Sequence, residues 1–247
     1  MVSIEAGEKR EPEQVVAMKK TVRTQRTDGG VTYHRILDAA GELFASIGLA
    51  ETTNKMIAAK AEVDLASINY HFGSRNGLYQ AVLVEAHRRL VSIESLQQLV
   101  STDLPAREKL RLLIEMLVES ATLDHGWHAR VLSREFLSPT SNLQALQRSE
   151  IPGKFPFVLA ILAEITAIPS GDPALLRCLI SVVAPCAMLL VVGRNVSALA
   201  DEIRHMPRED LVEHLYSFAI AGLEAIGNCQ ASPDARGSAS ASNGHTD

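Results

Sequence analysis

The sequence predicts an all-α protein in which a small N-terminal domain of three helices precedes a larger helical domain. Apolar residues recur at intervals of three and four along most of the chain, which is the period of an α-helix. No stretch alternates apolar and polar residues for long enough to indicate a β-strand. Aromatic residues make up only 4% of the 247 residues, and this composition favours helices over sheets.

Length, charge and cysteine content limit the class of protein further. The length fits one large domain or two small ones, and the composition excludes collagen-like, disulfide-stapled and fully disordered chains. The net charge of −5 argues mildly against a protein that coats nucleic acid by bulk charge, although the acidic excess lies in residues 92–247. Three cysteines without a CxxC pair and an N-terminus without an apolar leader lead us to expect a cytoplasmic protein with reduced thiols.

The first helix of the small domain follows a polar segment. Residues 1–30 are mixed in charge and end in a Gly-Gly pair, so we expect a disordered N-terminal arm. Apolar residues between Ile36 and Ile47 then fall on one face of a helix, and Gly48 is placed to end that helix. This helix opens a domain that we expect over residues 31–78.

The most informative pattern lies in residues 53–75. Two short helices, at 54–61 and 65–71, are joined by a three-residue turn, which is the helix-turn-helix arrangement. Thr53 is a good N-cap for the first of them, and Val63 supplies an apolar anchor in the turn. The residues expected to hold the two helices together are Ile57, Ala58, Ala61, Ile68 and Phe72. An ordinary helical hairpin is the alternative, and the combined signals of caps, turn and basic flank disfavour it.

Two sets of residues in this segment suit contacts to DNA. The second short helix leaves its N-terminal outer face free to enter a major groove, and the candidates for base contact there are Leu65, Ala66, Ser67 and Asn69. Leucine and alanine can touch a thymine methyl group, whereas asparagine suits adenine. Candidates for phosphate contact gather at helix termini nearby, and these are Thr53, Asn54, Lys55, Tyr70, His71 and Arg75. For Tyr70 a partly buried position in the core is the alternative.

The larger domain is expected over residues 79–227. Ser74 is placed to cap a long helix over 75–98, whose buried face would include Leu78 and Val82. Further helices are expected at about 103–124, 127–137, 142–149, 154–168, 173–193 and 208–226. The apolar run 179–192 has 14 residues, which is too short to span a bilayer, so we expect a buried helix and no membrane partner. A second disordered segment is expected over 228–247, which is rich in Ser, Ala and Gly.

Residues 32–83 resemble the TetR family of one-component transcriptional regulators. The resemblance rests on the LDAAGELFASIG first helix, the helix-turn-helix and the YHFGSRNGLYQAVL entry into a fourth helix. INYHFGSRNGLY and the later HARVLSREFLSPT are most similar to the CecR-type branch. The resemblance implies a regulator, usually a repressor, that binds a double-stranded DNA operator through residues 31–78. It also implies that residues 79–227 bind a small-molecule effector and form a homodimer.

The family's usual DNA contacts fall on the ten candidate residues given above. The sequence departs from the family at Glu62, because the family often has glycine in the turn. A left-handed backbone at Glu62 would cost on the order of 1 kcal/mol, and the carboxylate would lie near DNA. We therefore predict that Glu62→Gly raises stability.

Candidates for effector contact are fewer and each has a simpler alternative. They are Trp127, Arg130, Arg134 and Cys178. Trp127 can stack on a ligand or pack in the core, the two arginines fit a ligand site and the surface equally well, and Cys178 is more often a core thiol. His125 and His128 have a spacing that can bind metal, but no third ligand is near, so we expect no metal and no cofactor.

The last two predicted helices carry more apolar surface than a monomer needs. The candidates for a dimer interface are Cys186, Leu189, Leu211, Leu215, Phe218 and Gly222, and a purely intramolecular core is the alternative. An enzyme is not expected, because the chain lacks GxSxG, HExxH, GxGxxG after a strand and GxxxxGK[ST]. A helical adaptor that binds only protein would leave the polar and basic residues of 53–75 unexplained.

Overall fold

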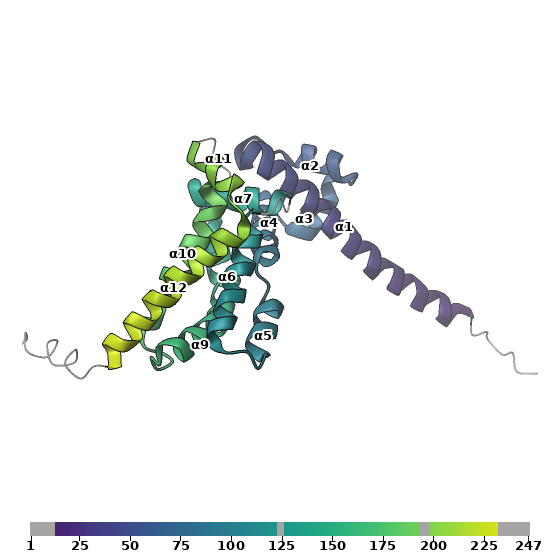
Figure 1. The fold of residues 1–247 in the computed structure, drawn as a ribbon. Coiled ribbons are helices and arrows are strands. Elements are labelled where there is room, and N and C mark those ends of the chain that lie inside the picture. Colours follow the sequence, from purple (N-terminus) through teal and green to yellow (C-terminus); the bar gives the residue numbers. More distant parts are fainter. Residues whose placement is uncertain (1–12, 123–125, 193–197, 232–247) are drawn as a thin grey trace, which may run out of the picture.

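The computed structural model describes residues 13–122, 126–192 and 198–231. Every regular element in these ranges is helical, which confirms the predicted fold class. Four helices, α1 to α4, form one end of the molecule, and the remaining helices form a second bundle beside them (Figure 1). Helix α7 contacts both α1 and α4, so it joins the two parts.

The small domain consists of α1 (Glu13–Glu51), α2 (Asn54–Ala61), α3 (Leu65–Phe72) and the first turns of α4 (Arg75–Leu90). Its core is formed by apolar residues that are at most 2% exposed, among them Ile36, Leu37, Phe44, Ile57, Ile68, Leu78 and Leu83. The predicted bounds of α2 and of the turn are confirmed.

Helix α1 begins earlier than the sequence indicated. Residues 13–30 are helical, so the expectation of a disordered arm is wrong for them, and residues 1–12 lie outside the described residues. Residues 13–28 contain neither Gly nor Pro, and the glycine pair that follows lowers helix propensity without preventing the helix. The predicted break at Gly48 is present as a kink, where the backbone has φ 88° and ψ 170°.

The long helix expected over 75–98 is wrong, because the chain forms two helices there. Helix α4 ends at Leu90 and α5 runs over Ile93–Ser101. Val91 is extended, and the Ser92 hydroxyl accepts a 2.9 Å hydrogen bond from the Ser95 N–H. Ser92 therefore acts as the N-cap of a new helix, although the apolar period continues across the break.

Besides α5, the second bundle contains α6 to α12. Their bounds are α6 Ala106–Thr122, α7 Trp127–Leu137, α8 Leu143–Ser149, α9 Phe155–Thr166, α10 Pro173–Val192, α11 Ala198–His205 and α12 Arg208–Ala231, with the 3-10 turn η1 at Pro152–Lys154. Helix α11 was not predicted, since Pro207 and its surroundings indicated only a loop. Residues 228–231 continue α12, so the expected disorder is wrong for them; residues 232–247 lie outside the described residues.

Helix α10 is longer than the apolar run from which it was predicted. Its 20 residues make it long and apolar enough to cross a membrane by length and composition, so the earlier argument from a 14-residue run does not hold. In the fold α10 contacts α6, α7, α9 and α12, and Cys178, Val182 and Cys186 are buried in the second core. Its buried face is therefore that of a bundle helix.

Candidate nucleic-acid interface and ligand cavity

The helix-turn-helix is held by capping bonds at both helices. The Thr53 hydroxyl accepts a 3.3 Å hydrogen bond from the Met56 N–H, and the Asp64 carboxylate accepts one of 2.6 Å from the Ser67 N–H. In the turn Glu62 has φ 53° and ψ 48°, so its backbone is left-handed, as the resemblance suggested. The two capping bonds fix where α2 and α3 begin.

Arg35 of α1 braces the same turn and was missed by the sequence analysis. Its guanidinium donates to the carbonyl oxygens of Ala61 at 2.6 Å and Glu62 at 3.2 Å, and it lies 3.4 Å from the Glu62 carboxylate. A single arginine on the polar side of a helix gives no sequence signal for such a bond. Arg35 thus supplies a hydrogen-bond donor to a carbonyl group at the C-terminus of α2.

Helix α3 presents the predicted reading face to solvent. Leu65 is 42% exposed and Tyr70 is 85% exposed, and Ala66 and Asn69 are exposed as well. Ser67 is half-buried, while Ile68 is fully buried and faces the core. The alternative that Tyr70 is a core residue is thereby excluded, and its hydroxyl is free to reach a phosphate.

The remaining candidates for phosphate contact lie around α3, and they differ in exposure and in hydrogen-bond partners. Thr53 and Lys55 are exposed at the N-terminus of α2, where free N–H groups favour an anion, and Asn54 beside them is half-buried. Arg75 is half-buried; its Nη2 donates to the Ala50 carbonyl at 3.2 Å, while its buried Nε has no partner among the described residues. The Nη2 group is thus anchored, while the neighbouring Nε has no partner in the described part of the chain.

His71 is held by rings rather than by hydrogen bonds. It is half-buried, and its ring meets those of Tyr33 and Tyr70 edge-on, with centroids 6.0 and 5.1 Å apart. Tyr33 in turn stacks on Phe72 at 4.7 Å. Tyr33 therefore orients the C-terminal end of α3 from α1, a role that sequence reasoning did not assign.

Two of the effector candidates lie at the junction between the domains. Trp127 is 5% exposed, its ring lies directly against Gly41 of α1, and it stacks on His128 at 3.8 Å. The Arg134 guanidinium donates to the carbonyl oxygens of Ala45 at 3.4 Å and Ser46 at 3.3 Å. These contacts fasten α7 to α1, so both residues are placed to join the domains, and neither lines the apolar cavity described below.

The other two candidates are placed apart from each other. Arg130 is exposed and borders, together with Trp127, an open depression of about 320 Å³ between α1, α2 and α7. Cys178 is 1% exposed in the second core and does not line the apolar cavity. Burial raises the pKa of the Cys178 thiol and raises that of Cys186 to about 11, which keeps both thiols protonated and unreactive.

The second bundle contains a partly open cavity of about 160 Å³ with an almost entirely apolar wall. Helices α4, α5, α6, α7, α9 and α10 contribute to it, and representative side chains are Leu90, Leu96, Leu113, Phe136, Phe155 and Leu179. Cys186 also lines it and is 2% exposed, so it faces inward and its assignment to a dimer interface is wrong. On α10 it occupies the same inward side as Val182 and Leu190.

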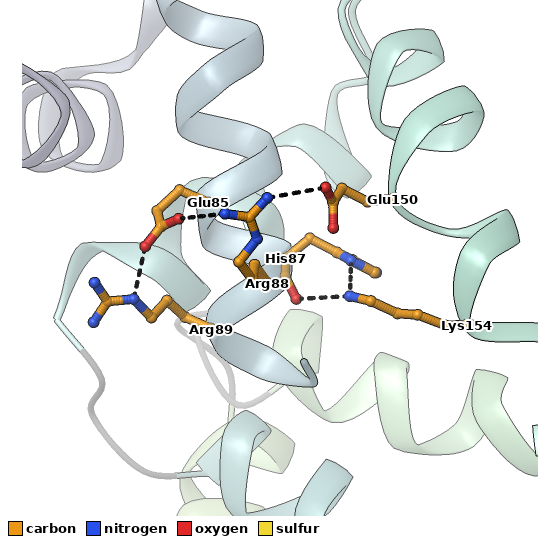
Figure 2. A network of polar contacts seen from close by, with 6 residues as sticks. All are labelled: Glu85, His87, Arg88, Arg89, Glu150 and Lys154. Atoms are coloured by element: carbon orange, nitrogen blue, oxygen red, sulfur yellow. Dashed lines mark hydrogen bonds and ion pairs between the residues drawn. The ribbon is translucent and has the colours of Figure 1, made fainter. Parts of the chain in front are cut away.

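A polar network meets the cavity wall where α4 ends (Figure 2). The Lys154 ammonium lies 2.8 Å from His87 Nδ1 and donates to the His87 carbonyl at 3.3 Å. Burial, and then the charge of Lys154, lower the pKa of His87 to about 4; burial lowers the pKa of Lys154 to about 8. At pH 7 a neutral imidazole therefore accepts from a charged ammonium. Sequence reasoning missed both residues, because neither belongs to a motif.

The predicted dimer residues fall into two groups. Phe218 is 70% exposed, and Gly222 is exposed with no atom near its missing Cβ. Leu189, Leu211 and Leu215 are half-buried against the second core, so they are only partly available to another molecule. Ile180 of α10, which was not predicted, is 65% exposed and adds to the apolar surface of the two helices.

The exposed α3 surface, the capped turn and the attached helical bundle define the class of helix-turn-helix transcriptional regulators. Residues 36–82 match the family model of bacterial regulatory proteins, tetR family. Residues 106–223 match that of the C-terminal domain of the HTH-type transcriptional dual regulator CecR. The chain belongs to the TetR family and carries a CecR-type C-terminal domain; this is a family of DNA-binding regulators and not of enzymes. No protein of curated function matches the sequence.

Solved structures of the same fold cover most of the chain. A TetR-family transcriptional regulator from Mesorhizobium loti is 18% identical with a TM-score of 0.60, over 80% of this chain and 97% of that one. FadR from Bacillus subtilis, solved with stearoyl-CoA, is 19% identical with a TM-score of 0.62, over 77% and 98%. NalD, the secondary repressor of the MexAB-OprM efflux pump in Pseudomonas aeruginosa, is 23% identical with a TM-score of 0.55, over 79% and 97%. At these identities the likeness concerns the fold.

Proposed function

We propose that the protein is a cytoplasmic, ligand-responsive repressor that binds a pseudo-palindromic operator as a homodimer and leaves it when a small molecule fills the apolar cavity. One observation carries the proposal: α4 connects the two sites. Its N-cap, Ser74, is separated from the end of α3 only by Gly73, and its last turn supplies His87 and Leu90 to the cavity wall. A 16-residue helix spans about 24 Å, so one rigid element reaches from the reading helix to the ligand site.

The mechanism follows from that connection. A ligand that changes the cavity wall displaces the last turn of α4, and the helix carries the displacement to α3. In a two-fold dimer this alters the separation of the two α3 helices, which must match successive major grooves. The ligand shifts the equilibrium by its preference for the displaced state, typically about 1–3 kcal/mol.

The DNA contacts divide into two classes by chemistry. Lys55, Tyr70 and Arg75 carry donors suited to phosphate, and such contacts position the protein without reading sequence. Asn69 is exposed on α3 and its amide suits an adenine edge, while Leu65 and Ala66 suit a thymine methyl group. The two classes respond differently to mutation, and this difference makes the proposal testable.

The decisive experiment is a selection of bound sequences from a random duplex pool with the full chain. We expect an inverted repeat with half-sites about one helical turn apart. Lys55→Ala should weaken binding to all sequences and reduce the slope of log affinity against log salt by about 1. Asn69→Ala should instead relax preference at one position of each half-site. Lys60→Ala is the matched control on the same helix, because Lys60 pairs with Glu42 at 2.7 Å.

Four outcomes would contradict parts of the proposal. A pool without any enriched sequence would favour the helical adaptor over the regulator. Base-selective loss from Lys55→Ala would remove its phosphate role, and uniform loss from Asn69→Ala would move that residue to the phosphate class. Transcription that rises when the operator is occupied would show an activator.

A further inference from the structure

We propose that the apolar cavity binds a small monocarboxylic acid with a body about the size of one aromatic ring, and that Lys154 binds its carboxylate. The inference rests on the proposed function, since the acid would be the effector. It concerns the chemical class of the ligand, which the family assignment does not specify. The residues that carry it are Lys154, His87 and the apolar wall around them.

Lys154 is a buried lysine on the cavity wall. Its residue is only 7% exposed, and it extends from the η1 turn to the end of α4 and lines the cavity (Figure 2). In the described part of the chain no carboxylate oxygen lies within 4 Å of its ammonium, and the nearby Glu150 pairs with Arg88 at 3.4 Å. A buried ammonium without a paired anion is costly. A carboxylate in the cavity would supply the missing counter-charge.

The rest of the cavity wall is almost entirely apolar. Besides Lys154 and His87, the wall contains one hydroxyl, that of Ser120, which donates to the Leu90 carbonyl at 2.5 Å. A cavity near 150 Å³ with such a lining admits benzene, and this one measures about 160 Å³. The wall thus accommodates one apolar ring or a short branched chain and offers a single charged group. A cationic ligand would be repelled by that group.

Lys154 also contacts α4, through His87. The His87 carbonyl accepts from Lys154 and also from the Val91 N–H at 3.4 Å, so Lys154 is bound to the last turn of α4. The ammonium has three N–H groups and His87 takes two of them, so a carboxylate that accepts two must displace a bond to His87. Binding of the acid therefore weakens the bond that Lys154 makes with α4, at the end of the helix that reaches α3.

The test compares acids with their neutral amides on the full chain, without DNA. The probes are benzoate, phenylacetate and hexanoate, each paired with its own amide, and titration calorimetry measures the affinity. We expect at least one acid to bind at least tenfold more tightly than its amide. Lys154→Met should remove that preference. Lys109→Met is the matched control, because Lys109 is half-buried and, like Lys154, donates to a backbone carbonyl, that of Val100 at 3.1 Å, but does not line the cavity.

The wild-type protein alone supplies a second test, which holds even if Lys154→Met does not fold. The charged groups near Lys154 are Glu94, Glu150 and Arg88. With a pKa of about 8, Lys154 loses its charge as the pH rises, while His87, with a pKa of about 4, stays neutral. The affinity for the acid should therefore fall by up to about tenfold per pH unit above pH 8, and that for the amide should not change.

Several results would overturn the inference. These are failure of all three acids to bind, equal affinity of acid and amide, an acid preference that survives Lys154→Met, or a flat pH profile. Each is measured without an operator, so failure here leaves the proposed DNA-binding function untouched. Conversely, a failed operator selection together with tight acid binding would reject the regulator and keep the acid site.

Discussion

The Tyr79 hydroxyl of α4 donates a 2.8 Å hydrogen bond to the Glu135 carboxylate of α7, and both side chains are buried. The second carboxylate oxygen accepts from the N–H and the hydroxyl of Thr140, each at 2.8 Å. Burial, followed by Glu135, raises the pKa of Tyr79, so the hydroxyl keeps its proton and remains a donor. This pair ties the helix that follows α3 to the helix that joins the two domains.

We expect Tyr79→Phe to lower the free energy of unfolding by about 1.5–3 kcal/mol, the range for a hydrogen bond to a charged group. The ring stays in place against Phe44, whose centroid is 4.9 Å away, so the change removes mainly the donor. Urea denaturation measures the effect. Tyr70→Phe is the control, since Tyr70 is 85% exposed and its hydroxyl should contribute under about 0.5 kcal/mol. Equal effects of the two substitutions would contradict a role for the Glu135 bond.

Glu62→Gly should raise the melting temperature. Glu62 has a left-handed backbone, which costs a residue with a Cβ roughly 1–2 kcal/mol. The substitution also removes the contact with Arg35, but that pair is 3.4 Å long with both side chains largely exposed, and such pairs contribute about 0–1 kcal/mol. The net gain expected from these two effects is about 1 kcal/mol, within a range of about 0–2 kcal/mol.

Glu62→Ala separates the two effects. It removes the carboxylate but keeps the Cβ, so it should not stabilise the protein, and Glu62→Gly should exceed it by about 1 kcal/mol. Thermal denaturation of both variants, followed by circular dichroism, gives the difference. If alanine and glycine behave alike, backbone strain at this position is not the cause.

Features set by neighbouring residues were predictable from the sequence, and those set by distant residues were not. Thr53, Ser74 and Gly48 mark helix ends through bonds or dihedral angles within one turn, and each was placed correctly. Arg35 and Lys154 act on residues 26 and 67 positions away, and nothing in their own surroundings in the sequence indicates the partner.

The break at Ser92 and the position of Cys186 show two further limits of sequence reasoning. At Ser92 the apolar period continues although the helix is interrupted. The extended residue before Ser92 ends α4, and the Ser92 side chain caps the start of α5. On α10 both an inner and an outer face are apolar, so periodicity could not tell whether Cys186 lines a cavity or meets a partner. The helices that carry the candidate DNA contacts were predictable because they form a short, locally capped segment, and the contacts themselves stay a prediction.

Gly41→Ala should destabilise the junction between the domains. A Cβ at Gly41 would lie 2.3 Å from the Trp127 indole, which is buried and stacked on His128 and so has little room to move. We expect a loss of about 1–3 kcal/mol, the usual cost of overpacking. Gly30→Ala is the control on the same helix, since no atom lies within 4 Å of its missing Cβ, and it should stabilise α1 by up to about 1 kcal/mol.

A double substitution tests whether Trp127 is the cause. Trp127→Leu removes the overlapping ring, so the combined Gly41→Ala and Trp127→Leu variant should lose less stability than the sum of the single losses. Denaturation of the four proteins gives the coupling energy. If the stability loss of the double variant equals the sum of the two single losses, the Trp127 ring is not what the new Cβ at position 41 overlaps.

The apolar outer surface of α10 and α12 predicts the last result, the loss of dimers in Gly222→Asp. Phe218 and Ile226 lie one turn before and after Gly222 on α12 and are 70% and 37% exposed, and Ile180 of the adjacent α10 is 65% exposed. Among the described residues of the chain, no atom lies within 4 Å of the missing Cβ of Gly222, so the new Cβ meets open space in the monomer. A charge there opposes burial of the stripe against a second copy.

We expect sedimentation or light scattering to show Gly222→Asp as a monomer that has lost operator affinity but keeps its helical content. Gln97→Asp on α5 adds the same charge at an exposed position away from α10 and α12 and should leave dimers intact. Gly227→Ala should instead lower the stability of the monomer, because its new Cβ would lie 2.6 Å from the Thr166 carbonyl of the same chain. Dimers that persist in Gly222→Asp at micromolar concentration would exclude this surface as the interface, and the two α3 helices would then have to be paired through another face of the molecule.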